Sequence, residues 1–180
     1  MRRLVTGHTP SGKSVFVSDG APPFHVAHEG GGLQITKLWG TEGVPVVPSP
    51  PGDPTLTPHQ FFPAPGGTRF LVVRIPPAAE AEAALQRGVD MDKAAQKMLD
   101  QLPGLGEVME HDQPGMHTSQ TIDYGIIMAG EVDLELDDGV KKRLKAGDFY
   151  VQSGTRHAWH NPGTEPCILV AVVVGAGRKA

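Results

Sequence analysis

Cysteine is almost absent from this sequence, which has a single one, Cys167, in 180 residues. One cysteine allows no internal disulfide and excludes a zinc site built from several cysteines. Long apolar runs are missing too, because the longest, CILVAVVV at 167–174, is far too short to cross a bilayer as a helix. The two arginines near the N-terminus are not followed by an apolar stretch, as they would be in a secretory signal. We therefore expect a cytoplasmic protein with no membrane partner.

An excess of positive charge is also missing. The chain has 16 Lys and Arg against 20 Asp and Glu, and its net charge is −4. The basic residues are scattered and form no stripe that could follow a phosphate backbone, so we expect no nucleic-acid partner. With 39% hydrophobic and 20% charged residues, the chain has the composition of a soluble globular protein, and its length fits one domain.

The sequence is rich in turn-forming residues, with 23 glycines and 17 prolines, which favours many short elements over long helices. Strand-like runs occupy 13–19, 33–39 and 69–75, and about five more lie between 122 and 174. Asp138 and Gly139 tolerate the positive φ of a tight turn and predict a hairpin there. This pattern is typical of an all-β barrel or sandwich.

Two segments interrupt the strands. Residues 43–67 are crowded with prolines, which lack the donor that a central strand needs, and predict an extended surface loop. Residues 90–102 have apolar side chains at helical spacing, with Asp90 as a cap, and a shorter helical turn is expected at 77–86. This helical insertion either covers the mouth of the barrel or packs on its outside.

One motif suggests a nucleotide at first sight. Residues 7–14, GHTPSGKS, match the phosphate-binding pattern G-x-x-x-x-G-K-[ST]. That loop works only between a buried strand and the N-terminus of a helix, whereas a β-type run follows Lys13 directly. We therefore interpret Pro10, Ser11 and Gly12 as a hairpin turn and expect no nucleotide cofactor.

Residues 117–128 alternate between polar and apolar side chains, as in a strand whose two faces differ. The polar face carries His117, Ser119, Thr121 and Asp123, and the apolar face carries Ile122, Tyr124, Ile126 and Met128. The polar face is a candidate metal or ligand site.

Residues 115–174 resemble the conserved barrel of the cupin family. The first family motif, H-x-H, three or four residues, E, six residues, G, is matched by His117, Asp123 and Gly130, with Ser119 in the place of the second histidine. The second motif is matched by Gly147, Gly154, His157 and Asn161. The resemblance implies a double-stranded β-helix, or jelly roll, in a single domain of residues 1–180. Its parts would be N-terminal strands and the proline-rich loop at 1–76, the helical insertion at 77–110 and the barrel core at 111–174.

The resemblance also implies a site. His117, Asp123 and His157 would converge as catalytic residues and as ligands of a divalent metal, for which Fe(II), Zn, Mn and Ni all suit two imidazoles and a carboxylate. Ser119, Thr121, Trp159 and Asn161 would line the ligand cavity. Two departures from the motifs weigh against a metal, because Ser119 replaces a histidine and Asp123 is shorter than glutamate. In the second motif, Gln152 replaces the usual proline.

The function implied is that of a metal-dependent enzyme, a dioxygenase, decarboxylase or isomerase, acting on an aromatic or oxo-acid metabolite. Two alternatives stay open. The same residues could form a metal-free acid/base set, or the barrel could bind a small molecule without turnover. Cupins of this kind commonly exchange N-terminal strands, so a homodimer is expected.

Overall fold

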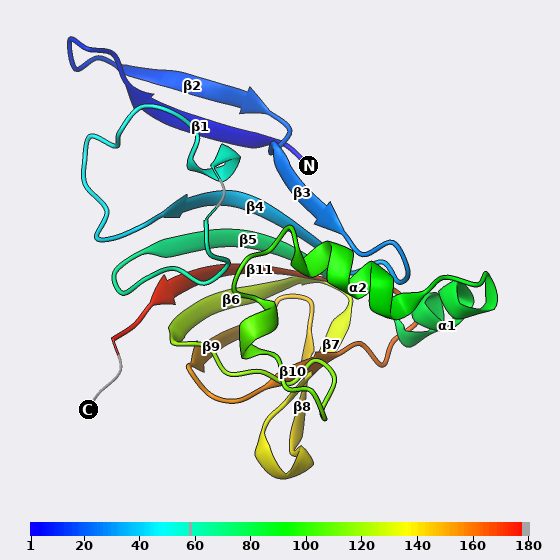
Figure 1. Ribbon diagram of the computed structural model, residues 1–180. Coiled ribbons are helices and arrows are strands. Elements are labelled where there is room, and N and C mark those ends of the chain that lie inside the picture. The colour runs from blue at the N-terminus through cyan, green and yellow to red at the C-terminus, as the bar shows by residue number, and fades with distance from the viewer. Residues whose placement is uncertain (58, 178–180) are drawn as a thin grey trace.

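The computed structural model describes residues 1–57 and 59–177, which form two facing antiparallel sheets with a separate hairpin and two short helices (Figure 1). The larger sheet has the strand order β3-β4-β5-β11-β6-β9, the smaller has the order β10-β7-β8, and β1 and β2 pair only with each other. The strands are β1 Arg3–His8, β2 Ser14–Gly20, β3 Phe24–Ala27, β4 Gln34–Thr41, β5 Thr68–Ile75, β6 Thr121–Ala129, β7 Glu131–Glu135, β8 Lys141–Lys145, β9 Phe149–Ser153, β10 Ala158–His160 and β11 Cys167–Gly175. The helices are α1 Ala78–Gln86 and α2 Met91–Leu99.

Strand β11 lies inside the larger sheet and pairs with β5 on one side and β6 on the other. Its side chains alternate, and those that face the interior are fully or almost fully buried: Cys167, Leu169, Ala171 and Val173. They pack with Ile127 of β6 and Val132 of the smaller sheet, both 0% exposed. The apolar core therefore lies between the two sheets, and the predicted jelly-roll fold is confirmed.

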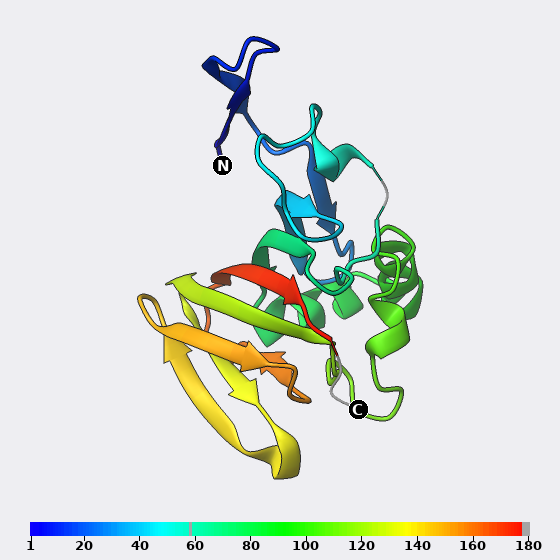
Figure 2. The same cartoon turned by 90° about the vertical axis from the view of Figure 1, so that its left-hand side faces the viewer.

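The chain passes from the larger sheet to the smaller at Gly130, between β6 and β7. Gly130 has a φ of 71°. A Cβ atom there would come within 2.5 Å of the carbonyl oxygen of Pro166, so only glycine fits at this corner. Figure 2 shows the strands of the smaller sheet, in yellow and orange, below β6 and β11.

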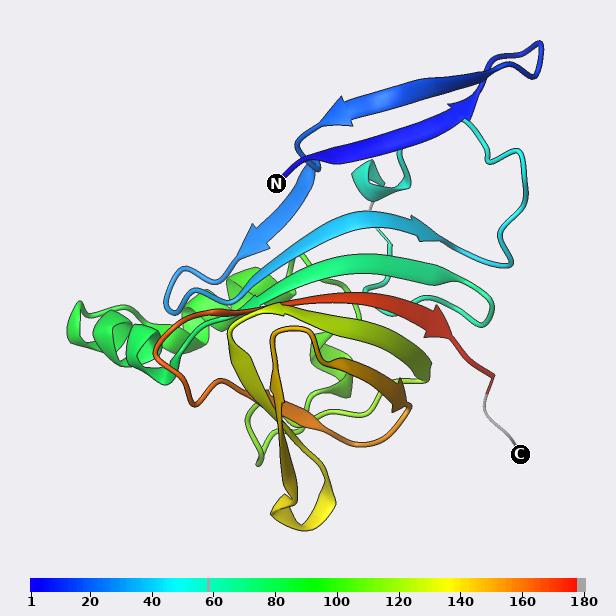
Figure 3. The same cartoon turned by 180° about the vertical axis from the view of Figure 1, so that it is seen from behind.

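Both predicted hairpins form. Asp138 and Gly139 have φ angles of 58° and 71° in the turn between β7 and β8. At the N-terminus, β1 pairs antiparallel with β2, and His8 lies opposite Ser14. Strand β2 follows Lys13 directly, so the phosphate-binding pattern at 7–14 is a hairpin, as expected. Figure 3 shows this hairpin standing apart from the larger sheet.

Arg3 helps to attach the N-terminal hairpin to the body of the molecule. Arg3 is 9% exposed, forms an ion pair with Asp53, and donates a 3.0 Å hydrogen bond to the carbonyl oxygen of Leu38. Its guanidinium also lies 5.8 Å from the ring centroid of Trp39. Arg3 therefore connects β1 to β4 and to the proline-rich loop.

The helical insertion follows the prediction. Asp90 caps α2 by accepting a 3.0 Å bond from the amide of Lys93, and α1 occupies the predicted shorter turn. Met98, together with Leu102 just beyond the helix, belongs to the core cluster that also contains Ile35 of β4. The insertion is thus packed into the core beside β3 and β4. No helix among the described residues is long and apolar enough to cross a membrane.

The N-terminal half contains two short elements that the sequence pattern does not predict. The proline-rich segment 43–67 is irregular, as predicted, except for one turn of 3-10 helix at Pro54–Leu56 that begins with Asp53. The sequence pattern missed β3, which has only four residues and pairs with β4 at the edge of the sheet.

We predict that Asn161→Ala destabilises the fold by about 2 to 4 kcal/mol, because buried backbone groups would lose their partners. The Asn161 side chain is 7% exposed, donates to the carbonyl oxygens of Ile75 (3.0 Å) and Glu165 (2.9 Å), and accepts from the amide of Gly163 (2.9 Å). Urea unfolding measures the change. The exposed neighbour Thr164 is the control, since Thr164→Ala should change stability by less than about 0.5 kcal/mol. A loss no larger for Asn161→Ala than for the control would contradict this role.

Candidate functional site

Strand β6 turns its polar residues into the barrel, as its alternation predicts. Thr121 is 1% exposed and Ile127 0%, on the same face as Asp123. On the other face Tyr124 is 52% exposed and Met128 58%. The polar side chains of the first motif therefore lie in the interior, at the end of β6 where the chain enters the barrel.

His117 and His157 meet in this interior. Their backbones form a two-residue bridge, with the amide of each donating to the carbonyl oxygen of the other at 3.0 and 2.9 Å. The bridge places the imidazole rings side by side, with centroids 4.2 Å apart. The structure thus joins one histidine from each motif, 40 residues apart in sequence.

The two rings are held in the same way. Nδ1 of His117 lies 3.0 Å from the carbonyl oxygen of Gly115, and Nδ1 of His157 lies 2.9 Å from that of Thr155. A carbonyl oxygen only accepts, so each Nδ1 carries the hydrogen and each Nε2 keeps a free lone pair. Both imidazoles can therefore accept a proton or bind an electrophile through Nε2.

Burial keeps this pair uncharged. Burial, reinforced by the neighbouring His117, lowers the pKa of His157 to about 4. The pKa of His117 is also lowered by burial, although the carbonyl oxygen of Gly115 and the carboxylate of Glu110 oppose the shift. At neutral pH both rings are neutral, and His117 is the more basic of the two.

Asp123 lies on the same interior face, but its hydrogen bonding differs from that of the two histidines. Its Oδ1 is shielded from solvent and has no hydrogen-bond partner in the described part of the chain. Burial raises the pKa of Asp123 to about 6, against the effect of a hydrogen bond with Thr121. Asp123 is therefore a carboxyl group that changes protonation close to neutral pH.

Aromatic rings surround these groups. Trp159 lies edge-on to His157 at 6.1 Å and to Tyr150 at 5.0 Å, and Phe62 lies 6.4 Å from His117. The Tyr150 ring covers Gly125 of β6, where a Cβ atom would come within 2.3 Å of the ring. Burial, and then the charge of nearby Asp123, raises the pKa of Tyr150, so its hydroxyl stays protonated.

Tyr150 is the residue that sequence reasoning missed. It lies within the second motif, three residues after Gly147, but the motif itself does not include it. The signal that could have found it is its place on β9, because β9 pairs with β6 and puts Tyr150 opposite Gly125.

The other predicted ligand-binding residues have their own partners. Ser119 and Thr121 are buried and hydrogen-bonded to each other, Oγ to Oγ1 at 2.8 Å. Asn161 bonds to three backbone groups, those of Ile75, Gly163 and Glu165. Trp159 faces the histidine pair. Of the predicted lining residues, Trp159 is the one whose contact with His157 is direct.

A metal site would need more donors than gather here. Among residues 1–57 and 59–177, no group of three or more His, Cys, Asp or Glu side chains lies close enough together to hold a metal ion. His117 and His157 come together, but Asp123 does not join them as a third ligand. Because protein metal sites commonly use three or four protein ligands, the donor set as it stands does not fit a resident metal.

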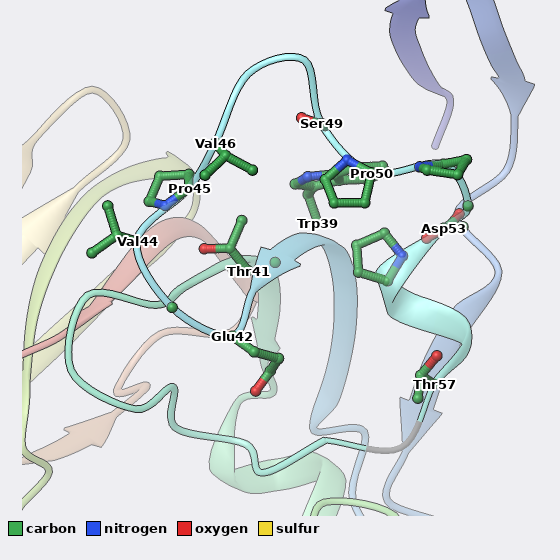
Figure 4. Close-up of a pocket in the computed structure, with 15 residues that line it drawn as sticks. Trp39, Thr41, Glu42, Val44, Pro45, Val46, Ser49, Pro50, Asp53 and Thr57 are labelled. Atoms are coloured by element: carbon green, nitrogen blue, oxygen red, sulfur yellow. The ribbon is translucent and has the colours of Figure 1, made fainter. Parts of the chain in front are cut away.

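A cleft of about 370 Å³ lies elsewhere, between the end of β4 and the proline-rich loop (Figure 4). Trp39, Thr41 and Glu42 form one side and prolines of the loop the other. Neither His117 nor His157 lines it.

Comparison with known proteins identifies the family. Residues 104–173 match the family model described as "Cupin domain", so this part of the chain is a cupin domain, and the resemblance found in the sequence is confirmed. Phomopsin biosynthesis cluster protein D of Diaporthe leptostromiformis is 52% identical over 46 residues, which are 26% of this chain and 24% of that protein. The cupin-domain-containing oxidoreductase srdD of Neurospora crassa is 34% identical over 95 residues, 46% of this chain and 45% of that protein.

The match spans less than half the length of either of these curated relatives. Among solved structures, the Schizosaccharomyces pombe Cnp3 cupin domain is similar with a TM-score of 0.48 and 11% identity, covering 97% of this chain and 87% of that one.

We predict that Asp123→Asn stabilises the protein by about 2 to 3 kcal/mol at pH 7. The pKa of this carboxyl is about 6 in the folded protein, against an ordinary value of 3.8, so its ionised form destabilises the fold above pH 6. As the pH falls from 6 to 4, the folded protein takes up a proton that the unfolded chain does not, and this cost disappears. The advantage of the Asn variant should therefore vanish near pH 4.

Urea unfolding of both proteins at pH 7 and pH 4 measures the difference. The exposed Asp112→Asn is the matched control and should have little effect at either pH. An Asn variant with the same stability as the wild type at pH 7 would show that Asp123 is not held in a low-dielectric interior.

Proposed function

We propose that the barrel interior is the catalytic site of a small-molecule enzyme that acts by proton transfer on an aromatic or oxo-acid metabolite. The observation that carries the proposal is the pair of neutral imidazoles, each with its Nδ1 on a backbone carbonyl and its Nε2 free. A side chain prepared in this way accepts a proton without first having to lose one.

His117 is the general base in this proposal. A base works best when its pKa lies near the operating pH, and the pKa of His157 is lowered to about 4, too far for efficient proton abstraction. His117 is the more basic ring, and the carboxylate of Glu110 favours its protonated form. His157 stays neutral and accepts a hydrogen bond from the substrate at Nε2.

Tyr150 and Asp123 complete the set. Tyr150 keeps its hydroxyl proton and can donate a hydrogen bond to an oxygen atom on which negative charge develops. Asp123, with a pKa near 6, can return a proton to the substrate. Both belong to strands that pair with each other, β9 and β6.

The aromatic side chains beside the two histidines favour a flat substrate. Phe62 lies next to His117, and Trp159 lies next to His157. Rings at such positions bind aromatic groups by stacking. The names of the relatives also support a biosynthetic small-molecule enzyme, since they include biosynthesis cluster proteins and oxidoreductases.

Proton exchange tests this proposal. The wild-type protein should accelerate the exchange of the hydrogens next to the carbonyl of 4-phenyl-2-oxobutanoate for deuterium in D2O, measured by proton NMR. General-base catalysis contributes about 100-fold or more, so His117→Gln should reduce the rate by about that factor. His111→Gln, at an exposed position, is the matched control and should catalyse the exchange at the wild-type rate. A wild-type rate equal to the spontaneous one would contradict the proposal.

A resident metal ion is the competing hypothesis, with Fe(II), Zn, Mn or Ni bound by His117, His157 and Asp123. We expect protein purified without a histidine tag to contain much less than one ion per chain by plasma emission. Ser119→His supplies the missing imidazole, and this variant should bind about one ion when it is titrated anaerobically.

A full ion per chain in the wild type, lost in His117→Ala and in His157→Ala, would instead support the metal-dependent enzyme. Binding of 4-phenyl-2-oxobutanoate without any exchange would favour the alternative of a ligand-binding module without turnover. Thermal unfolding of each variant shows whether the barrel is intact.

We also propose that the protein is a homodimer that buries the outer face of the larger sheet. Apolar side chains on neighbouring strands form this face: Tyr124 (52% exposed) lies opposite Val151 (64%) of β9 and Val172 (37%) of β11. Phe149, 77% exposed, extends it toward the edge. An apolar sheet face of this extent is typical of an interaction surface.

Light scattering at micromolar concentration should give a dimer mass. Tyr124→Lys combined with Val151→Lys should give a monomer. Two ammonium groups on neighbouring paired strands cannot be buried against a second copy without partners. Leu85→Lys, at a position 59% exposed on α1, is the control and should stay dimeric. A monomeric wild type would rule this arrangement out.

A further inference from the structure

A second chemical centre lies outside the histidine site, in a cleft that we call the lysine cleft. Its volume is about 270 Å³, and it is closed by β3 and β4, by the segment around the 3-10 turn and by the end of α2. Its walls are part apolar and part polar, with Phe24, Leu56 and Pro103 among the apolar residues and Lys37, His59 and Asp100 among the polar ones.

Lys37 is the unusual residue of this cleft. It is 6% exposed, on β4 directly opposite Phe24 of β3. Its Nζ lies 4.3 Å from the centroid of the Phe24 ring, a contact that by itself favours the ammonium form. Burial acts in the opposite direction, because taking an ammonium ion out of water is costly, and it favours the neutral amine. Burial, and then the charge of Arg69, lowers the pKa of Lys37, while Glu42 opposes the shift.

Arg69 and Glu42, the charged groups that act on Lys37, form hydrogen bonds and an ion pair with other groups. Arg69 is 2% exposed and donates to the carbonyl oxygens of Gln60, Thr41 and Thr68. It also pairs with the carboxylate of Glu42 at 2.8 Å, and Glu42 lies 3.6 Å from His59. Asp100 adds a carboxylate to the lining. The carboxylate of Asp100 in this lining disfavours an anionic ligand, whereas a neutral ligand meets no such repulsion.

We propose that the Lys37 amine forms an imine with a small aldehyde or ketone that carries an apolar body, bound in the lysine cleft. The Lys37 nitrogen forms a bond to the carbonyl carbon, and the carbonyl oxygen takes up a proton to give a carbinolamine. Loss of the nitrogen proton and of water then gives the C=N bond, so no oxidant or reductant is needed. His59 lines the same cleft and can carry the proton to the departing oxygen.

The size and lining of the cleft define the ligand class. A volume of about 270 Å³ falls just below the range of drug-sized sites, which begins at about 300 Å³, so the ligand is a small metabolite. Phe24, Leu56 and Pro103 suit an aromatic or branched aliphatic body. This site shares no residue with the histidine pair, and it goes beyond the function proposed above.

Reductive trapping tests the imine. The full-length wild-type protein is incubated at pH 7 with benzaldehyde and sodium cyanoborohydride, which reduces the iminium ion to a stable benzylamine. Peptide mass mapping then gives the initial rate at each lysine. We expect Lys37 to be benzylated several-fold faster than the exposed Lys142, although it is the less accessible of the two. Equal or slower modification of Lys37 would overturn the proposal.

Two further arms of the experiment test whether the fast adduct belongs to Lys37 and to a neutral ligand. In Lys37→Arg, whose guanidinium cannot form the imine, the fast adduct should be lost while adducts at Lys142 persist. Benzoate should not protect Lys37, and protection as strong as that by a non-reactive ketone analogue such as tert-butyl phenyl ketone would show an anion site instead. The variant with both His117→Gln and His157→Gln should trap benzaldehyde as the wild type does, which separates this result from the outcome of the proton-exchange experiment.

Discussion

The alternation of side chains along β6 and β11 is the constraint on which the rest of the structure depends. In each strand, alternate side chains point into the barrel and the others point outward. The eight paired positions between the two strands fix this register. A shift of β11 by one residue would expose Leu169 and Ala171 and bury Val172, and a shift of β6 by one residue would turn Asp123 out of the interior. The core, the polar site and the apolar outer face thus follow from one register.

Burial then determines the chemistry of the interior. The same low-dielectric surroundings lower the pKa of His157 to about 4 and raise that of Asp123 to about 6, because each group is held more easily without its charge. An interior that carried a divalent cation would act in the opposite direction on Asp123, since a neighbouring positive charge favours the carboxylate. A divalent ion bound beside Asp123 would therefore lower the pKa of this carboxyl from the value of about 6 that burial gives it.

Much of this could be predicted from the sequence, because the relevant signals are local. The alternation at 117–128, the Asp138-Gly139 turn and the Asp90 cap are each determined by a few neighbouring residues, and each appears where it was expected. The approach of His117 to His157 was also predictable, since the family motifs imply it. The role of Asn161 was not, because its three partners include Ile75, which is distant in sequence and is fixed only by the complete fold. Tyr150 was missed for the same reason, since its contact with Gly125 depends on the pairing of β9 with β6.

Lys37 shows where sequence reasoning reaches its limit. A single lysine between Thr36 and Leu38 looks like an ordinary polar residue of a strand, and nothing in its neighbours marks it as buried. Three other segments line its cleft: β3 supplies Phe24, the proline-rich segment supplies His59, and the end of α2 supplies Asp100. All three belong to the parts of the chain outside the matched domain at 104–173. Lys37 itself lies on β4, also outside that domain, so both the amine and the residues that line its cleft belong to the part of the chain that precedes the matched cupin domain.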